Sequence, residues 1–90
     1  MSYDVGALRA REFPWRDSTP AVYLNSASTG PLPLRTVRAV GAFTDLRHEP
    51  HRMPDTLLFE TLARSRALAA RLIHAAPEEI ALAANTSYGI

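Results

Sequence analysis

The sequence of 90 residues contains neither lysine nor cysteine. Because lysine is missing, no side-chain amine of this chain can form a Schiff base with a carbonyl group. Because cysteine is missing, disulfides, thiolate nucleophiles and thiolate metal sites are excluded from the chain. All ten basic residues are arginines. Covalent chemistry through an amine or a thiol side chain is therefore not expected here.

The chain also lacks a strong net charge and a long apolar run. Ten basic and nine acidic residues leave a net charge of +1, which is too balanced to indicate nucleic acid or an acidic membrane. No apolar run approaches the roughly 18–20 residues of a membrane span, and the first residues lack the apolar core of a signal peptide. We expect a cytoplasmic protein with neither nucleic acid nor a membrane as its partner.

What is present is close to an average globular composition. Hydrophobic residues make up 47% of the chain and charged residues 21%, which excludes disordered, collagen-like and coiled-coil classes. At roughly 100–200 residues per domain, the chain is at most one small domain or a part of a larger one.

Proline positions and apolar spacing predict three helices, over residues 4–12, about 34–47 and about 54–75. The third has the clearest pattern, because apolar and small residues recur along one stripe at steps of four and three positions. The stripe consists of Leu58, Leu62, Ser65, Ala69, Leu72 and Ile73. Burial contributes roughly 1.5–3 kcal/mol for each large side chain, so we expect this helix to pack against a partner surface.

Two short apolar segments are predicted to be β-strands. Residues 21–24 combine β-branched and aromatic side chains between Pro20 and the polar Asn25. Residues 80–84 form an apolar run with side chains small enough to be buried on both faces. We expect residues 14–20 to form a loop, residues 28–33 a turn, and a further helix to begin near Ser87.

The segment after the second predicted strand brings together hydroxyl groups and the unpaired N–H groups of a helix start. Its polar residues are Asn85, Thr86 and Ser87. Such an arrangement suits the binding of a phosphate group. The alternative is that one of these residues only caps the helix, which is the commoner use of such residues. The spacing alone leaves both interpretations open.

Two motifs together resemble the aminotransferase class V family of pyridoxal-phosphate-dependent enzymes, which includes cysteine desulfurases, selenocysteine lyases and isopenicillin-N-epimerase-like proteins. Tyr-Leu-Asn-Ser-Ala-Ser-Thr-Gly-Pro-Leu-Pro at 23–33 is similar to the opening segment of that family. Asn-Thr-Ser-Tyr-Gly-Ile at 85–90 is similar to its phosphate loop, and residues 77–82 resemble the usual lead-in. The resemblance covers roughly residues 10–90.

The resemblance implies an α/β fold, the N-terminal fragment of the aspartate-aminotransferase-like fold of type I. Residues 1–76 would be an N-terminal segment with two amphipathic helices, and residues 77–90 the truncated start of the large cofactor-binding domain. The phosphate of pyridoxal 5'-phosphate would be bound by Asn85, Thr86 and Ser87. The substrate side of the cleft would contain Asn25, Ala27 and Ser28. An ordinary exit from a strand into a turn is the alternative for these last three residues.

The resemblance also implies that the chain belongs to a longer enzyme. Such an enzyme needs a lysine for its cofactor, so no catalytic residue is expected in this fragment and the chain alone is not expected to be active. The parent would be a homodimer acting on an amino acid by transamination, epimerisation or carbon–sulfur lyase chemistry. The pair His51 and Arg52 resembles one in the desulfurase branch, but Asp55 stands where that branch has a second histidine. This difference argues against sulfur transfer.

Other functions are less well supported by the sequence. His48 and His51 have the spacing of a helical metal half-site, but Pro50 would break the helix between them, and no metal site is predicted. His74 is interpreted as a surface residue near a helix end. The arginines are interleaved with acidic residues and match no nucleic-acid-binding motif. The remaining alternative is a small helical protein-interaction module without catalytic activity, which leaves the apolar run at 80–84 unexplained.

Overall fold

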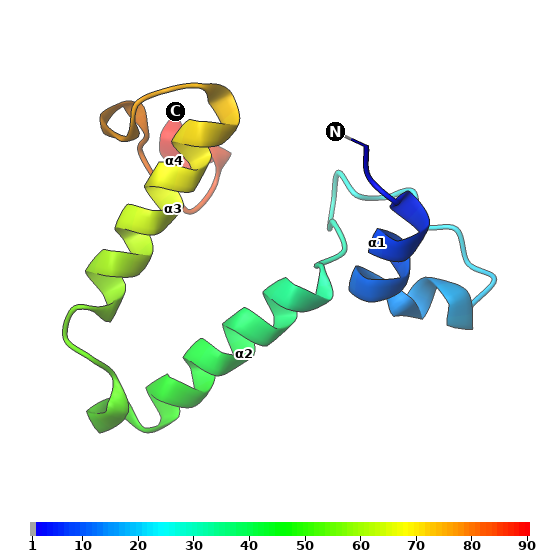
Figure 1. Ribbon diagram of the computed structural model, residues 1–90, viewed down its shortest axis with the longest axis horizontal. Coiled ribbons are helices and arrows are strands. Elements are labelled where there is room, and N and C mark those ends of the chain that lie inside the picture. The colour runs from blue at the N-terminus through cyan, green and yellow to red at the C-terminus, as the bar shows by residue number, and fades with distance from the viewer. Residues whose placement is uncertain (1) are drawn as a thin grey trace. The chain divides into compact units, whose positions relative to one another are not determined.

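The computed structural model describes residues 2–90, which divide into two compact units between Pro50 and His51. Every regular element among these residues is a helix (Figure 1). The α-helices are α1 (Val5–Glu12), α2 (Leu34–His48), α3 (Leu57–Ile73) and α4 (Thr86–Gly89). Short 3-10 helices span Pro14–Ser18, Pro50–Arg52 and Pro77–Glu79. No helix among residues 2–90 is long and apolar enough to cross a membrane.

The predicted α/β fold, and with it the fragment of a type I fold, is wrong for this chain, because residues 2–90 contain helices and no β-strand. The two segments expected to be strands, 21–24 and 80–84, join no ladder of backbone hydrogen bonds. Ile80 does have extended backbone, with φ −104° and ψ 123°. A β-strand needs a neighbouring strand to pair its N–H and C=O groups, and the described residues supply none.

The N-terminal unit begins with α1, which confirms the helix predicted for residues 4–12. Asp4 caps it, since its Oδ1 accepts a hydrogen bond from the Ala7 N–H at 3.0 Å. Pro14 follows the helix end and lacks the N–H that a further turn would need. Instead of the expected loop, Pro14 starts a 3-10 helix, in which the Ser18 hydroxyl donates to the Trp15 carbonyl at 2.7 Å.

Helix α2 confirms the second predicted helix but starts without a local cap. Pro33 precedes it and offers no side chain that could accept a hydrogen bond from the first turn. The missing acceptor comes from Glu12 at the end of α1, whose carboxylate binds the Arg35 N–H at 3.1 Å. Figure 1 shows α1 beside the N-terminal end of α2. The two helices of this unit are therefore joined by a capping interaction over a long sequence separation.

The second unit contains α3, which starts three residues later than predicted. Pro54 lies outside the helix, in a turn where its carbonyl accepts the Leu57 N–H at 3.1 Å. The helix ends at Ile73, and His74 adopts left-handed backbone with φ 56°. The Ala70 carbonyl then accepts the N–H groups of both His74 and Ala75, which closes the helix end.

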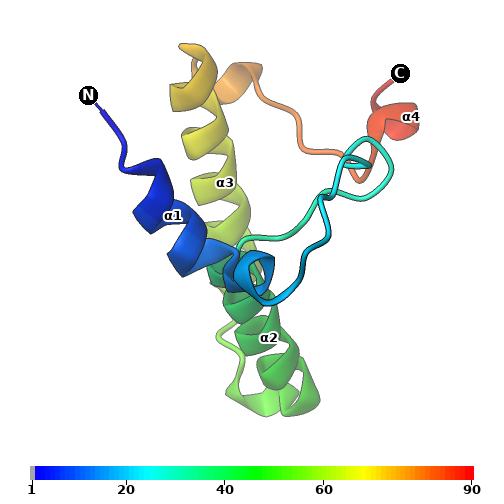
Figure 2. The ribbon, with the colours of Figure 1, turned by 90° about the vertical axis from the view of Figure 1, so that its right-hand side faces the viewer.

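After α3 the chain turns through the 3-10 helix Pro77–Glu79, which is capped by a side-chain hydrogen bond. The Ala76 N–H donates to Glu79 Oε2 at 2.8 Å, which closes the 3-10 helix Pro77–Glu79, and this helix contacts α3. Figure 2 shows the chain leaving this helix in an irregular path that ends in α4. Glu78 and Glu79 therefore belong to a single 3-10 turn.

Very little of the described chain is buried. Ala70 is the one buried apolar residue among residues 2–90, and Glu12 is the one buried charged residue. The apolar stripe predicted on α3 forms a helix face, but Leu58 and Leu62 on it remain about half exposed and Leu72 is 83% exposed. The surface that this stripe was expected to pack against is not supplied by the described residues.

Candidate functional site

The C-terminal turn is organised by Asn85, which caps α4. Its Oδ1 accepts a hydrogen bond from the Tyr88 N–H at 2.8 Å, and its backbone is extended, with φ −162° and ψ 172°. An asparagine in this conformation binds the third N–H of the helix and leaves the first two without an acceptor. Asn85 therefore sets the shape of the turn.

Thr86 and Ser87 supply the first two N–H groups of α4. Neither N–H group has a hydrogen-bond partner within residues 2–90, and the same holds for the two side-chain hydroxyls. Both residues are exposed, and no acidic residue follows Glu79 in the chain. The turn thus offers four hydrogen-bond donors to an anion, with the asparagine oxygen engaged elsewhere.

The residues predicted to face the substrate share a turn in the N-terminal unit. The Asn25 carbonyl accepts the N–H groups of Ser28 and Thr29 at 3.1 and 3.2 Å. The Tyr23 hydroxyl donates to the carbonyl oxygens of Asn25 and Thr29 and so ties the turn together. Ala27 lies in this turn and is exposed, as are Asn25 and Ser28. The turn covers residues 25–29, earlier in the chain than the predicted 28–33.

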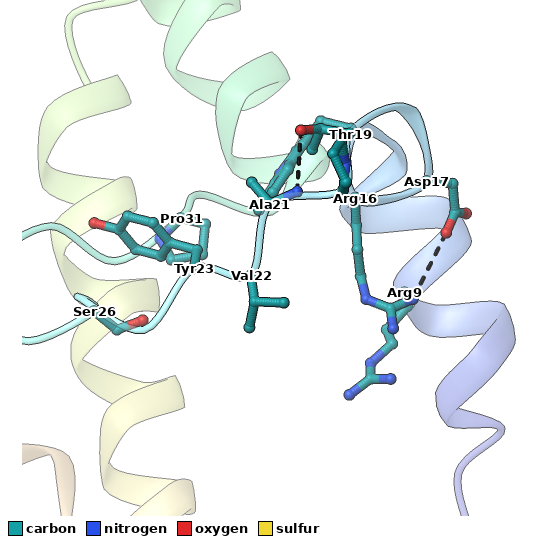
Figure 3. A pocket seen from close by; sticks show the side chains of 11 residues that line it. Arg9, Arg16, Asp17, Thr19, Ala21, Val22, Tyr23, Ser26 and Pro31 are labelled. Carbon is teal, nitrogen blue, oxygen red and sulfur yellow. Dashed lines mark hydrogen bonds and ion pairs between the residues drawn. The ribbon is translucent and has the colours of Figure 1, made fainter.

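A cavity of about 510 Å³ lies beside that turn, between α1, the 3-10 helix Pro14–Ser18 and the segment 19–31. Ser26 lines it, whereas Asn25, Ala27 and Ser28 do not. Figure 3 shows two arginines and an aspartate on one side of the cavity and Tyr23 and Pro31 on the other. The turn predicted to bind substrate therefore borders a cavity through a single serine.

The positive charges of this cavity come from residues that the sequence reasoning did not single out. Arg9 lies near the end of α1, and Arg16 and Asp17 belong to the following 3-10 helix. Arg16 pairs with Asp17 at 3.6 Å, and Arg9 forms no ion pair within the described part of the chain. Arg9 and Arg16 are seven positions apart in the sequence, and no local motif relates them.

The most strongly bound carboxylate is that of Glu12, which is 6% exposed. Besides the Arg35 N–H, it accepts hydrogen bonds from the Nε atoms of Arg35 and Arg11, the latter at 3.3 Å. The hydrogen bond from the Arg35 N–H, followed by that from its guanidinium, lowers the pKa of Glu12. A carboxylate with a lowered pKa that is fully engaged is a poor general base at neutral pH, so Glu12 has a structural role.

None of the three histidines is part of either turn. His48 is the last residue of α2, whereas His51 belongs to the 3-10 helix Pro50–Arg52, so the two do not share one helix face. Among residues 2–90, no three side chains of the ligating types histidine, aspartate and glutamate form a group that could hold a metal ion. His74 closes α3 in left-handed backbone.

Comparison with family models, curated proteins and solved structures finds no match to this chain. The two turns belong to different units: the one at 25–29 to the N-terminal unit and the one at 85–87 to the C-terminal unit. Each is therefore interpreted from its own residues.

Proposed function

We propose that this chain supplies the phosphate-binding turn of a pyridoxal-phosphate-dependent enzyme that acts on an amino acid, of the aminotransferase class V type that the sequence resembles. The observation that carries the proposal is the exposed turn at 85–87, in which Asn85 caps the helix while Thr86 and Ser87 keep free donors. The proposal rests on this turn and on the order of the two motifs, and it needs no sheet within these residues.

The donors of the turn fit a phosphate group. Phosphate accepts several charge-assisted hydrogen bonds. Thr86 and Ser87, which carry the N–H and hydroxyl donors, are both exposed residues. The oxygen of Asn85 is held by the Tyr88 N–H and does not compete for them. When bound, the cofactor supplies an electron-withdrawing ring that stabilises a carbanion at the substrate carbon. The role of this chain is to hold and orient the cofactor through its phosphate.

The remaining parts of such an enzyme would come from outside these residues. The chain has no lysine, so the covalent attachment of the cofactor has to involve another segment. The turn at 25–29, with Asn25, Ala27 and Ser28, is proposed to contribute to the substrate side of the cleft. Transamination, epimerisation and carbon–sulfur cleavage are all compatible with the same phosphate-binding turn. The proposed assembly of the enzyme is a homodimer.

The phosphate assignment is tested with pyridoxine 5'-phosphate, which has the ring and phosphate but no aldehyde, against pyridoxine. We expect amide resonances of Thr86 and Ser87 to shift with the phosphorylated compound only. Thr86→Pro removes one N–H and one hydroxyl yet suits the first helical position, because Asn85 before it is already extended. This variant should weaken binding by more than about 10-fold, because it loses two charge-assisted donors and the loss of each one alone is expected to cost about 10-fold.

Two further variants serve as controls. Thr86→Val keeps the N–H and loses only the hydroxyl, so its binding should lie between that of the wild type and that of Thr86→Pro. Tyr88→Phe changes an exposed ring on the same turn and should leave binding unchanged. Equal shifts with pyridoxine and its phosphate, or wild-type binding by Thr86→Pro, would contradict the proposal.

A non-catalytic interaction module is the second candidate, and the exposed apolar face of α3 favours it. On this face Leu58 and Leu62 are about half exposed and Leu72 is 83% exposed, which suits a helix that docks on a partner. A module of this kind should unfold cooperatively as the 90-residue chain, whereas a segment that needs the rest of an enzyme should unfold over a broad range. Thermal unfolding followed by circular dichroism separates the two.

A further inference from the structure

We propose that the cavity of the N-terminal unit binds a small monocarboxylate that carries an apolar ring. The cavity has about 510 Å³ and lies beside α1, within the range of small-molecule sites. The proposal uses residues of the N-terminal unit alone and none of the turn at 85–87, so it stands whether or not that turn binds a cofactor phosphate.

One side of the cavity is cationic. Arg9 and Arg16 both line it, and Figure 3 shows their side chains on the side nearest α1. Arg16 shares its charge with Asp17 at 3.6 Å, while Arg9 has no ion pair within residues 2–90. A guanidinium group presents paired N–H donors that match the two oxygens of a carboxylate. The unpaired Arg9 is the group we assign to the ligand's carboxylate.

The other side is apolar and aromatic. Trp15, Tyr23 and Pro31 line this cavity and also a smaller one of about 240 Å³, so the two adjoin at the rings. Trp15 and Tyr23 are 42% and 44% exposed, which leaves ring surface that a ligand can cover. The Tyr23 hydroxyl is held by the carbonyls of the 25–29 turn, and this fixes the position of its ring.

The charge of the lining selects a monoanion. Two arginines and one aspartate give a net charge of +1, from two positive charges minus one negative charge. A monocarboxylate neutralises this charge, whereas a dianion would leave a negative charge beside Asp17. A bare ion would not cover the rings of Trp15 and Tyr23. The combination therefore fits a carboxylate joined to a ring, and neither part alone should bind as well.

The test uses the intrinsic fluorescence of Trp15, which is the one tryptophan of the chain and lines the cavity. The probe is cyclohexylacetate, which has a carboxylate and an apolar ring and does not absorb with tryptophan. We expect a saturable change with the wild-type chain. Cyclohexylacetamide lacks the charge and acetate lacks the ring, and each should bind about 10-fold more weakly or worse.

The assignment of the arginines is tested by Arg9→Gln, which should raise the Kd for cyclohexylacetate about 10-fold while leaving that for cyclohexylacetamide unchanged. Arg66→Gln, an exposed arginine of α3, is the matched control and should bind like the wild type. Helix content measured by circular dichroism confirms that each variant is folded. Two results with the wild-type chain alone would overturn the proposal. One is equal affinity for cyclohexylacetate and cyclohexylacetamide, and the other is the absence of a saturable change in Trp15 fluorescence.

Discussion

The two units of the chain are stabilised by different kinds of contact. In the N-terminal unit, one buried carboxylate joins α1 to α2, since Glu12 binds both the backbone and the guanidinium of Arg35 across 23 positions of sequence. In the C-terminal unit, hydrogen bonds run between residues at most five positions apart around Ala70 and Glu79. One unit depends on a single long-range ionic contact and the other on a series of local ones.

This difference predicts which substitutions destabilise each unit. A unit joined by one carboxylate loses its arrangement when that group is removed or protonated, although its separate helices can persist. In the C-terminal unit the one carboxylate that forms a cap, Glu79, binds a backbone N–H only three positions away, so this unit should respond mainly to changes in volume and backbone conformation. Variants that remove charge, add volume or relieve strain should therefore act on different units.

Glu12→Ala should have the largest effect. Alanine preserves the helix propensity of α1 but removes both hydrogen bonds that join Glu12 to Arg35 of α2. We expect the Arg35 amide to exchange its hydrogen on the order of 10-fold faster, because it loses its acceptor. Nuclear magnetic resonance measures this exchange residue by residue.

Two controls separate the backbone contact from the side-chain contact. Arg35→Gln keeps the hydrogen bond from the backbone N–H of residue 35 to Glu12 and loses only the guanidinium. The hydrogen-exchange rate of this amide should therefore rise less than in Glu12→Ala. Glu60→Ala removes an exposed carboxylate from α3 and should leave residue 35 unaffected. An unchanged exchange rate in Glu12→Ala would show that the carboxylate does not cap α2.

Protonation of Glu12 at low pH should have the same effect as Glu12→Ala. The Arg35 N–H and guanidinium lower the pKa of Glu12 below its ordinary value of 4.5, so the unfolded chain binds the proton more readily than the folded one. The contribution of Glu12 to stability is therefore complete above pH 4.5 and is lost as the pH falls through the lower, folded-state pKa.

This pH dependence is measured from the chemical shift of the Arg35 amide during an acid titration. The shift should stay constant from about pH 7 to about pH 5 and change only in stronger acid. In Glu12→Ala the same amide should show no such transition. A transition centred above pH 5 would mean that the carboxylate is not stabilised in its charged form.

The sequence predicts the structure best where the structure is set by local contacts. Helices α1 and α2 were located because Pro14 and Pro33 limit them and apolar spacing identifies their faces. Such signals act within a few residues and need no knowledge of distant partners. The sequence predicts the start of α3 three residues too early, because proline suits a first helical turn, whereas Pro54 forms a separate turn before the helix.

The errors concern contacts made over longer distances. Residues 21–24 and 80–84 have strand composition, but a strand forms only when another pairs with it, and composition does not say whether one is present. The contact of Glu12 with Arg35 was missed because no local pattern relates them. One signal was available: an acidic residue at a helix C-terminus is disfavoured by the helix dipole, so Glu12 was in need of a partner.

The candidate sites were predicted unevenly for the same reason. The polar turn at 85–87 is continuous in sequence, so the residues that offer donors could be named in advance, although their use by a phosphate stays a prediction. The cavity beside α1 combines Arg9, Trp15 and Tyr23 from three different segments. Its lining depends on how those segments pack, which sequence spacing does not reveal.

Ala70→Leu should act on the stability of the C-terminal unit. Ala70 is 1% exposed, so a larger side chain has to displace its neighbours, at a cost of about 1–3 kcal/mol. Ala63→Leu makes the same change at an exposed position of α3 and should alter stability by less than about 0.5 kcal/mol. Thermal unfolding followed by circular dichroism compares them, and equal stability of the two variants would show that Ala70 is not enclosed.

His74→Gly should have the smallest effect and should stabilise the C-terminal unit. His74 has a φ of 56°, a left-handed conformation that is unfavourable for residues with a Cβ atom and costs glycine nothing. Glycine relieves this strain, but it also has a greater conformational entropy in the unfolded chain, which offsets part of the benefit. The free energy of unfolding should rise by about 0.5–1 kcal/mol. A higher melting temperature of the helical signal would reveal the gain.

The side chain of His74 provides its own control for this prediction. His74→Ala removes the imidazole but keeps the Cβ atom and therefore the backbone strain, so it should not stabilise the unit. His74→Asn should lie between alanine and glycine, because asparagine tolerates left-handed backbone better than most residues. If alanine raised the melting temperature as much as glycine, the gain would come from loss of the imidazole, and backbone strain at the end of α3 would not be its cause.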